Sequence, residues 1–300
     1  MEKLITIVGL TSSGKSGLAI ELAKKFNGEI VSADSRQVYK HLDWCSGKVT
    51  KKEMEEVPHH LIDVCELGTQ FSLFDFQKMA YNEIDDIIKN GKTPFLVGGT
   101  GLYSRAVVEG YDLSEQKPDE KLRTELSQKS LEELVEICKS KGIDSSGEQT
   151  CRRLIRLIEK NNFVSQNKPK YDVLQIGIMW ERLEIYERIR KRLKMRMPYM
   201  IEEIKTLLSE GYDKEFLMTL GLEAKNVILY LDGKFGSYEE FFEQLFKEER
   251  HFAKRQQTWY NKEKNIVWLD AKDNLLEKSS KLIEEFLKNN LNFDKSEIKD

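Results

Sequence analysis

Short apolar runs alternate with amphipathic segments over the first hundred residues of the chain. Four of these runs have the length of buried strands, at residues 4–8, 29–33, 61–64 and 94–97. Between them, apolar residues at helical spacing predict helices over residues 15–26 and 72–90. Strands that alternate with helices are typical of an α/β fold, a mostly parallel sheet flanked by helices that binds its ligands at the carboxyl ends of the strands.

The pattern changes near residue 112. From there to about residue 172 the sequence is polar and helix-prone without a convincing strand, which predicts a helical insertion domain over 112–172. The core is then expected in two parts, 1–111 and 173–300. The second part begins with a strand at 173–179, continues as largely helical sequence and adds a last strand at 266–269. The polar end from about Asn289 is expected to be frayed.

Composition narrows the class of protein. A chain of 300 residues that is 40% hydrophobic can bury one sizeable core, alone or with a smaller appended unit. The formal net charge is only −3, so charge must be judged locally. The cysteines form no C-x-x-C pair, which argues against a zinc site or a disulfide framework and fits a reducing compartment; they are Cys45, Cys65, Cys138 and Cys151.

The sequence also predicts where the protein works. Its start has neither the basic region nor the apolar stretch of a signal peptide. No apolar run approaches the 18 residues or so that a membrane-spanning helix needs. A soluble cytoplasmic protein is therefore expected, with no membrane contact and no obligate protein partner.

The stretch GLTSSGKS, directly after the first predicted strand, has the spacing of a phosphate-binding loop. Its backbone N–H groups and the start of the next helix form a nest for anions, Lys15 adds a positive charge, and the Ser16 hydroxyl is placed to ligate Mg²⁺. A chance match in a Gly/Ser turn is disfavoured, because a strand precedes the stretch and an amphipathic helix follows it. The predicted loop residues are Gly9, Leu10, Thr11, Ser12, Ser13, Gly14, Lys15 and Ser16.

A carboxylate is missing where a nucleotide-hydrolysing protein would have one. A hydrolase or kinase with this loop usually has a second apolar strand that ends in Asp and holds the metal. Here that strand ends in PFLVGGTGLY, with glycines and Thr100 instead. Glycines at a strand end permit close approach of a ligand, which Thr100 could then reach, although a tight strand-to-helix turn explains GGTGLY equally well. The nearest acid at a strand end is Asp34, in SADSRQVY.

Seven segments together resemble the tRNA dimethylallyltransferases, or isopentenyl-tRNA transferases. They occur in family order and cover most of the chain: GLTSSGKS, VSADSRQVYKHLD, PHHLIDV, FLVGGTGLY, RRLIRLIE, YERIRKRL and AKRQQTWY. The resemblance implies a P-loop fold whose loop holds the pyrophosphate of dimethylallyl diphosphate, not ATP. Two segments depart from the family pattern: CSGKV stands where GTAK is usual, and LGLEAKN where Gly-Tyr-Lys or Gly-Tyr-Arg is usual.

The implied reaction transfers the dimethylallyl group to N6 of the adenosine 3′ to the anticodon, position 37 of tRNA. Asp34 is then the candidate general base for the amine proton, in place of a simple loop acid. Lys15, the loop amides and Mg²⁺ on Ser16 would stabilise the leaving diphosphate. Thr100 would form a hydrogen bond near the breaking C–O bond. The family's R-I-x-x-R pattern identifies Arg192 as a further cation that reaches the diphosphate.

Helical spacing predicts a buried stripe around Arg192, made of Leu183, Tyr186, Ile189, Leu193 and Met197. Arginines lie mostly beside this stripe, where the usual outcome is a solvated face. They are Arg188, Arg190, Arg192 and Arg196.

Basic residues on two further helices predict contacts with RNA. CRRLIRLIEK carries cations around an apolar stripe, a local patch suited to phosphates, although solvated surface charge explains it better without the family resemblance. A second group, around residues 250–259, mixes cations, an amide and an aromatic ring as single-stranded loop recognition requires. The target base must leave its stack to reach Asp34. The predicted RNA contacts are Asp34, Ser35, Arg36, Gln37, Thr100, Arg123, Arg152, Arg153, Leu154, Ile155, Arg156, Arg255 and Gln256.

Three alternatives to tRNA prenylation fit the sequence less well. An enzyme that prenylates free AMP or ADP is disfavoured by the predicted insertion with its basic helix. A small-molecule kinase that uses ATP is disfavoured by the GGT strand end, and a non-catalytic RNA-binding protein would need neither the phosphate loop nor Asp34. The expected ligands are tRNA and dimethylallyl diphosphate, with Mg²⁺ as the cofactor.

Overall fold

The computed structural model describes residues 1–113, 119–148, 150–160 and 167–288. The tail predicted to be frayed, from Asn289, lies outside the described residues. The chain forms two compact units, one of Met1–Gly110 with Pro169–Asp300 and one of Tyr111–Lys168. We call them the core unit and the helical unit.

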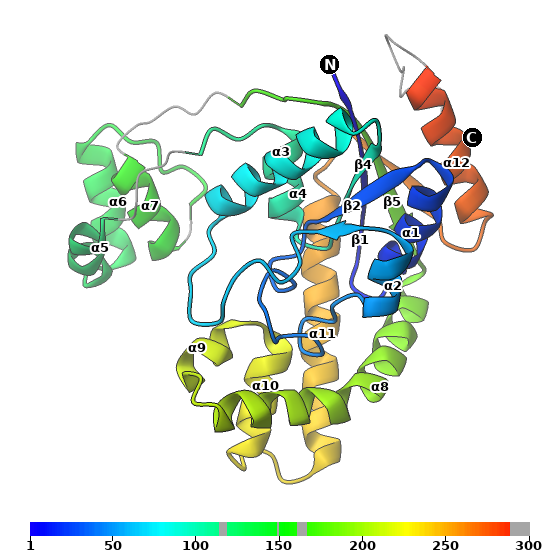
Figure 1. The fold of residues 1–300 in the computed structure, drawn as a ribbon. Coiled ribbons are helices and arrows are strands. Elements are labelled where there is room, and N and C mark those ends of the chain that lie inside the picture. The colour runs from blue at the N-terminus through cyan, green and yellow to red at the C-terminus, as the bar shows by residue number, and fades with distance from the viewer. Residues whose placement is uncertain (114–118, 149, 161–166, 289–300) are drawn as a thin grey trace. The chain divides into compact units, whose positions relative to one another are not determined.

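The core unit is built on one six-stranded parallel sheet (Figure 1). Its strands run in the order β3-β2-β4-β1-β5-β6, so β1 is central and its carboxyl end lies between those of β4 and β5. The mostly parallel sheet expected from the sequence is confirmed. The strands are β1 (Lys3–Gly9), β2 (Gly28–Ser32), β3 (His59–His60), β4 (Thr93–Val97), β5 (Asp172–Met179) and β6 (Ile266–Asp270).

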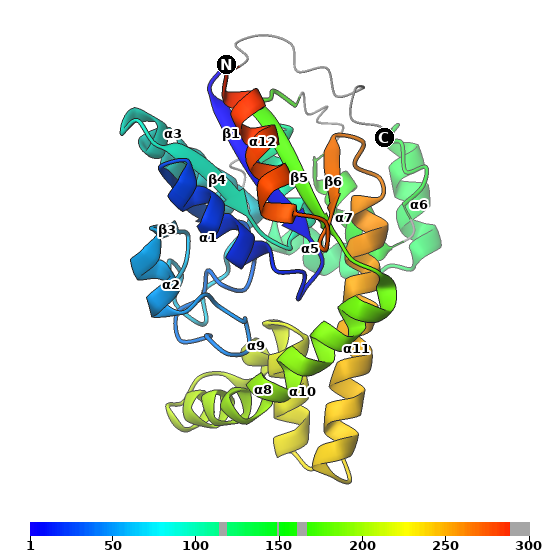
Figure 2. The ribbon, with the colours of Figure 1, turned by 90° about the vertical axis from the view of Figure 1, so that its right-hand side faces the viewer.

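Helices cover both faces of the sheet, because successive side chains of β1 point to opposite sides. Ile5 and Ile7 pack with α1 (Lys15–Lys25) and α12 (Leu275–Lys288) on one face, where the two helices lie side by side (Figure 2). Leu4 packs on the other face with α3 (Leu73–Lys89) and α4 (Gly101–Val108). Both faces of β1 are thus buried, which fits its almost unbroken apolar run.

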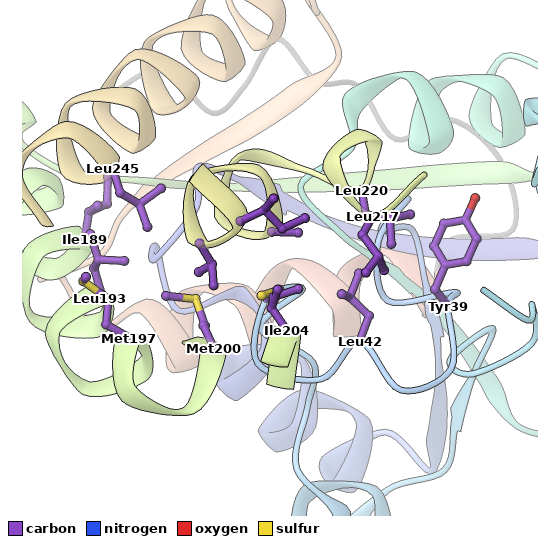
Figure 3. Close-up of a cluster of buried hydrophobic side chains, with 14 of the residues drawn as sticks. Tyr39, Leu42, Ile189, Leu193, Met197, Met200, Ile204, Leu217, Leu220 and Leu245 are labelled. Atoms are coloured by element: carbon purple, nitrogen blue, oxygen red, sulfur yellow. The ribbon is translucent and has the colours of Figure 1, made fainter. Parts of the chain in front are cut away.

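Four further helices pack around the carboxyl end of β1. Their apolar faces share one cluster with Val8 and Leu10, and Figure 3 shows Ile189, Leu193 and Met197 of this cluster along one side of α8. The predicted stripe is wrong at Leu183, which is 77% exposed because it falls in the first turn of α8; the inward position belongs to Ile185. The helices are α8 (Arg182–Ser209), α9 (Lys214–Thr219), α10 (Leu222–Leu231) and α11 (Tyr238–Tyr260).

The strand predicted at residues 61–64 is not formed. β3 ends at His60, because Leu61 and Asp63 take the left-handed conformation with φ of 60° and 57°. Asp63 then donates its backbone N–H to Gln37, and Val64 to Val38, so the segment runs beside residues 37–39 as a loop. A short helix, α2 (Lys51–Glu56), precedes this region. The apolar residues of this run therefore lie in a turn and not in a strand of the sheet.

The helical unit contains α5 (Glu120–Ser127), α6 (Leu131–Ser140) and α7 (Cys151–Lys160), and no strand among its described residues. The three helices bury a small apolar cluster of their own, with Leu126, Leu134, Cys138, Ile143, Leu154 and Ile158 at its centre. Ser130 caps α6 through a reciprocal pair of hydrogen bonds with Glu133. Within the described parts of both units, every helix is too short or too polar to cross a membrane.

Candidate active site

The stretch GLTSSGKS forms the turn between β1 and α1. Ser12 and Gly14 take positive φ values of 61° and 95°, which reverses the backbone in a short space. Gly9 has a φ of 150°, which residues with a side chain rarely adopt, and a Cβ there would lie 3.0 Å from the Ser13 hydroxyl, so glycine is favoured at this position. Gly14 gives α1 no side-chain cap, and the first N–H groups of the helix are left for an external acceptor.

Side chains from distant parts of the sequence fix this loop. The Thr11 N–H donates to Oε1 of Gln256 at 2.8 Å. The carbonyl oxygens of Ser12 and Ser13 accept hydrogen bonds from Arg188 Nε at 2.8 Å and Trp180 Nε1 at 2.9 Å. Sequence reasoning missed the roles of Trp180 and Arg188, because the contacts span more than 160 residues.

Lys15 is the cation of the loop, and its surroundings destabilise its protonated form. Its Nζ donates to the Leu10 carbonyl oxygen at 2.7 Å. Burial, and next the nearby Arg192 guanidinium, lower the pKa of Lys15 to about 8, although Asp34 acts in the opposite direction. A bound anion would offset both unfavourable effects and stabilise the protonated amine, so the site favours binding of an anion.

The carboxyl ends of β2 and β4 meet because position 98 is glycine. A Cβ at Gly98 would collide with the Ala33 carbonyl oxygen. The glycine was expected to admit a ligand, and instead it admits the neighbouring strand's backbone. The contact brings Asp34, just beyond β2, beside Thr100, just beyond β4.

Asp34 is held by one of its two carboxylate oxygens. Oδ1 accepts the backbone N–H of Arg36 at 2.8 Å and, more weakly, that of Gln37 at 3.4 Å. Oδ2 has no hydrogen-bond donor among the described residues, and Asp34 lines the cavity described below. Thr100 steadies the same turn, since its Oγ1 accepts the Ser35 N–H at 3.1 Å. One oxygen orients the carboxylate and the other stays available to a substrate.

Gln256 links the phosphate loop to the end of β4. Besides accepting from Thr11, its amide donates through Nε2 to the Gly99 carbonyl oxygen at 2.8 Å. The side chain is buried, so the amide predicted to contact RNA is engaged inside the protein at both ends. A side chain at Gly101 would collide with the Trp259 ring, which explains the last glycine of GGTG.

Arg192 lies in the wall of the cavity, as expected for a diphosphate ligand. Its guanidinium donates to Thr11 Oγ1 and to the Gly47 carbonyl oxygen, both at 3.3 Å. Burial, and next the neighbouring Arg196, lower the pKa of Arg192. Arg196 was expected at a solvated face but is buried, with Nε donating to the Trp44 carbonyl oxygen at 3.0 Å.

A pair of glutamates accompanies these arginines. Glu223, from the LGLEAKN segment, lies 3.6 Å from Arg196, and Glu249 is only 4% exposed. Burial, and next the charge of Glu223, raise the pKa of Glu249 to about 8, which favours its protonated form at neutral pH, and a hydrogen bond with Glu223 acts in the same direction. Sequence reasoning missed Glu249. Its position on the buried stripe of α11, one helical turn before Ala253, was the available signal.

These groups surround one cavity of about 970 Å³ within the core unit. It is lined by the phosphate loop from Thr11 to Ser16 and by predicted residues from the strand ends and later helices. The sequence therefore predicted groups that the fold does bring together. They include Lys15, Ser16, Asp34, Ser35, Arg36, Gln37, Thr100, Arg192, Arg255 and Gln256.

The predicted RNA contacts of the helical unit form a separate group. Arg123 and Arg156 both donate to Glu159, at 2.9 Å and 2.8 Å. Burial alone would raise the pKa of Glu159, but these hydrogen bonds lower it to about 2. Arg153 forms a weaker pair with Glu148, with nitrogen and oxygen 3.3 Å apart. Part of the positive charge expected on this surface is therefore balanced.

The apolar members of that prediction do not behave alike. Leu154 has no exposed surface and packs in the centre of the helical unit's cluster, so its side chain cannot contact RNA in this structure. Ile155 is half-buried against the same cluster. Arg152 is exposed and remains available to a ligand.

A divalent metal would find few protein ligands. Among the described residues, no group of three His, Cys, Asp or Glu side chains could hold an ion. The half-buried Ser16 hydroxyl lines the cavity next to the loop amides. Mg²⁺ characteristically keeps several waters and binds through one or two protein oxygens and the substrate's phosphates, so the residues present fit an ion that arrives with a diphosphate.

Comparison with known proteins agrees with this arrangement. The family model described as IPP transferase matches residues 37–263, and the one described as isopentenyl transferase matches residues 2–68. The tRNA dimethylallyltransferase of Carboxydothermus hydrogenoformans is 38% identical, over 96% of this chain and 99% of its own length. The tRNA dimethylallyltransferase 2 of Treponema denticola is 40% identical, over 88% of this chain and 93% of its own.

The fold is similar to that of a solved relative. The full-length tRNA isopentenylpyrophosphate transferase of Bacillus halodurans superimposes with a TM-score of 0.73 at 35% identity, over 96% of each chain. The resemblance carried by the seven sequence segments is thereby confirmed. The chain belongs to the IPP transferase family, whose members are prenyl-group transferases.

Proposed function

We propose that this enzyme transfers the dimethylallyl group of dimethylallyl diphosphate to N6 of the adenosine at position 37 of tRNA and releases diphosphate. The observation that carries the proposal is the pairing, in one cavity, of a phosphate loop with the half-free carboxylate of Asp34. A nucleotide-hydrolysing site would need a metal-binding carboxylate at the end of β4, where this chain has Gly98, Gly99 and Thr100. Relatives named for this activity support the assignment.

The loop side of the cavity binds the leaving group. The free N–H groups at the start of α1, the Lys15 ammonium and the Arg192 guanidinium converge there, and they stabilise the negative charge that grows on the diphosphate as the C–O bond breaks. We assign Ser16 as the protein ligand of Mg²⁺, which when bound neutralises part of the diphosphate charge.

The strand-end side of the cavity serves the acceptor. The N6 amine forms the new C–N bond with the allylic carbon, while the electrons of the C–O bond leave with the diphosphate. Oδ2 of Asp34 accepts the proton that the amine loses. The Arg36 N–H keeps that carboxylate in place by donating to Oδ1. Thr100 steadies the same turn by accepting the Ser35 N–H.

A basic groove on α11 supports RNA as the acceptor. It has a volume of about 460 Å³ and is lined by one face of the helix and by Lys262, just beyond its end. Among the described residues its cations form no ion pair, so their charge is available to phosphates. We propose that this groove and the arginines of α7 contact the anticodon arm. The lining residues are His251, Lys254, Arg255, Thr258, Trp259 and Lys262.

The setting we propose is the cytoplasm. All four cysteines are free thiols, and a reducing compartment keeps thiols in that state. The partners we propose are tRNA and dimethylallyl diphosphate.

The deciding experiment measures single-turnover transfer from labelled dimethylallyl diphosphate to bulk tRNA, with AMP and ADP as alternative acceptors and ATP as an alternative donor. Transfer to tRNA should require a divalent ion, proceed without any nucleoside triphosphate, and be far faster than transfer to AMP. Asp34→Asn should bind both substrates but react roughly 10²-fold more slowly or worse, the scale for losing a general base.

Asp86→Asn is the matched control, because Asp86 is an exposed aspartate of α3 whose one ion pair among the described residues is with Lys89. It should react at the wild-type rate. Near-normal chemistry in Asp34→Asn would remove the general-base assignment. Comparable rates with AMP would favour a free-nucleotide prenyltransferase, and obligatory ATP hydrolysis would favour a kinase.

A further inference from the structure

Two aromatic rings are stacked on the surface of the core unit. The centroids of Trp44 and Tyr199 are 4.2 Å apart, and the ring planes differ by 16°. Both are largely exposed, Trp44 to 42% and Tyr199 to 53%. Large aromatic side chains usually gain stability by burial, so a solvent-exposed stacked pair calls for another explanation.

The backbone beneath Trp44 is fixed in this position. The Glu203 carboxylate accepts three consecutive backbone N–H groups, of Asp43 at 2.6 Å, Trp44 at 2.7 Å and Cys45 at 2.8 Å. The Trp44 carbonyl oxygen accepts from the buried Arg196 guanidinium. These bonds are charge-assisted and therefore strong. They fix the backbone from which the exposed Trp44 side chain projects, because this backbone cannot rotate without breaking them.

The pair is continuous with the active-site cavity. Residues Cys45 and Ser46, next to Trp44 in the chain, line the cavity. On α8, Met195 and Lys191 lie one and two turns before Tyr199 and line it too. Met195 is 59% exposed. A strip of side chains therefore runs from the cavity to the stacked rings: Lys191, Met195, Tyr199 and Trp44, which we call the aromatic strip.

We propose that the aromatic strip is a stacking platform for an unpaired base of the RNA acceptor, adjacent to the base that enters the cavity. The proposal rests on RNA being the acceptor, as argued above. Every base has an apolar face that stacks on an exposed ring, and cations beside the ring attract the flanking phosphate. Lys191 and Lys194 have no ion-pair partner among the described residues, so they supply that charge.

A second copy of the chain fits this surface less well. A specific protein interface needs about 800 Å² of surface from each partner, whereas the exposed apolar side chains here are three, Trp44, Met195 and Tyr199. Lysines flank them on α8, and lysine is depleted in the centres of protein interfaces. A flat ring pair next to free cations suits one nucleotide.

The test uses the full-length protein and an anticodon stem-loop RNA that carries the fluorescent base 2-aminopurine at one loop position at a time. Wild type should quench the fluorophore at the position that stacks on the strip. Trp44→Ala and Tyr199→Ala should each abolish that quenching and weaken RNA binding roughly tenfold, within the range for losing one stacked base. The loss should appear in the KM for RNA, and Trp44→Phe should restore part of it.

The salt dependence of binding separates stacking from charge. Stacking releases no counterions, so Trp44→Ala should leave the slope of log affinity against log salt unchanged, whereas Lys194→Ala should lower it by about 0.7. Tyr238→Ala, at an exposed aromatic residue that starts α11, is the matched control and should bind as wild type does.

Two results would overturn the platform: wild-type affinity and quenching in both alanine variants, or wild-type self-association in sedimentation that Trp44→Ala abolishes. Circular dichroism of each variant identifies any loss of folding, and Trp44→Phe keeps the test decisive in that case. If the wild type itself transfers nothing to RNA, the proposed function fails. If the wild type transfers to RNA normally and both alanine variants keep wild-type RNA affinity and quenching, the platform fails but the proposed function stands.

Discussion

Helices α7 and α8 look alike in sequence, because each has three or more arginines among apolar residues. The glutamates near these arginines nevertheless differ in the direction in which the fold shifts their pKa. Glu159 is partly exposed and receives hydrogen bonds from Arg123 and Arg156, which outweigh its burial and lower its pKa to about 2. Glu249, beside α8, is fully enclosed and faces a second carboxylate, so its pKa rises to about 8. Arginine and glutamate therefore form an ionic pair in the helical unit, whereas beside α8 the protonated, uncharged form of the glutamate is favoured.

This contrast shows what packing does with an arginine. On α7 the guanidiniums face solvent and meet carboxylates, which balances part of their charge. On α8, Arg188 and Arg192 donate to oxygens of the phosphate loop, and Arg196 donates to the backbone of Trp44. The acceptors of Arg188 and Arg192 are neutral, so these two cations keep a charge that can attract an anion. Arg196 differs, because the Glu223 carboxylate lies 3.6 Å from it. We therefore assign α8 to the wall of the proposed active site and α7 to a recognition surface.

The strongest effect should separate two arginines of α8. Arg192→Met removes a cation and two hydrogen bonds from the wall of the cavity, so transfer should slow roughly 10²- to 10³-fold and diphosphate should bind more weakly. Arg190→Met is the matched control, because Arg190 forms an exposed pair with Glu243, and such pairs contribute little. Rates at saturating RNA and calorimetric diphosphate affinity would measure both. Equal losses in the two variants would contradict the distinction.

An intermediate effect concerns α7 and RNA. Replacing Arg152, Arg153 and Arg156 together by alanine should weaken tRNA binding and lower the salt slope by about 0.7 to 0.9 for each phosphate that is no longer bound. Dimethylallyl diphosphate binding should stay unchanged. Glu159→Gln tests the same surface in the opposite direction: it frees Arg123 and Arg156 from a carboxylate, so tRNA should bind more tightly. A triple variant with wild-type affinity and slope would exclude α7 from recognition.

The weakest effect should be on stability against pH, and its sign differs between the two glutamates. A carboxyl group whose pKa is raised by folding favours the folded chain while protonated. The contribution of Glu249 is therefore complete below about pH 4.5 and is lost as pH rises through about 8. The pKa of Glu159 is lowered by folding, so its contribution is present above about pH 4.5 and is lost as pH falls towards 2.

Urea unfolding at pH 3, 6 and 9 would measure these differences. Between pH 6 and 9, Glu249→Gln should gain stability relative to wild type, while Glu159→Gln should keep a constant deficit. Between pH 6 and 3 the deficit of Glu159→Gln should shrink. Titrating groups that do not interact with the substituted glutamate cancel in each comparison, because every variant differs from wild type at one position. A constant difference for Glu249→Gln across pH 6 to 9 would contradict the protonated state assigned to that residue.

Local patterns were sufficient to predict the sheet and the loop. β1, α1 and the turn between them lie within the first 25 residues, and each is specified by its own apolar spacing or glycines. The strand predicted at 61–64 failed because spacing does not reveal backbone conformation, and Leu61 takes a positive φ. Leu183 failed because the helical period does not say where the first turn lies.

The site was predictable where a motif marks it and otherwise was not. Lys15, Asp34 and Thr100 each follow a strand, so a parallel sheet must bring them to one edge. Glu249 and Arg196 interact electrostatically through the packing of α11, α10 and α8, although they are 53 positions apart in the sequence. No local pattern encodes such an arrangement, and the raised pKa of Glu249 follows from its burial and from the neighbouring Glu223 carboxylate.

The weakened charge of Lys15 couples substrate binding to protonation. With a pKa of about 8, a sizeable share of free enzyme molecules carries this amine uncharged in mildly alkaline solution. Binding of diphosphate beside Lys15, as we propose, should then draw a proton from the medium, and release of the product should return it. The heat of association should accordingly vary with the ionisation enthalpy of the buffer, and the apparent affinity should decline above pH 8. Substrate binding by this enzyme is therefore expected to be coupled to protonation of the Lys15 amine.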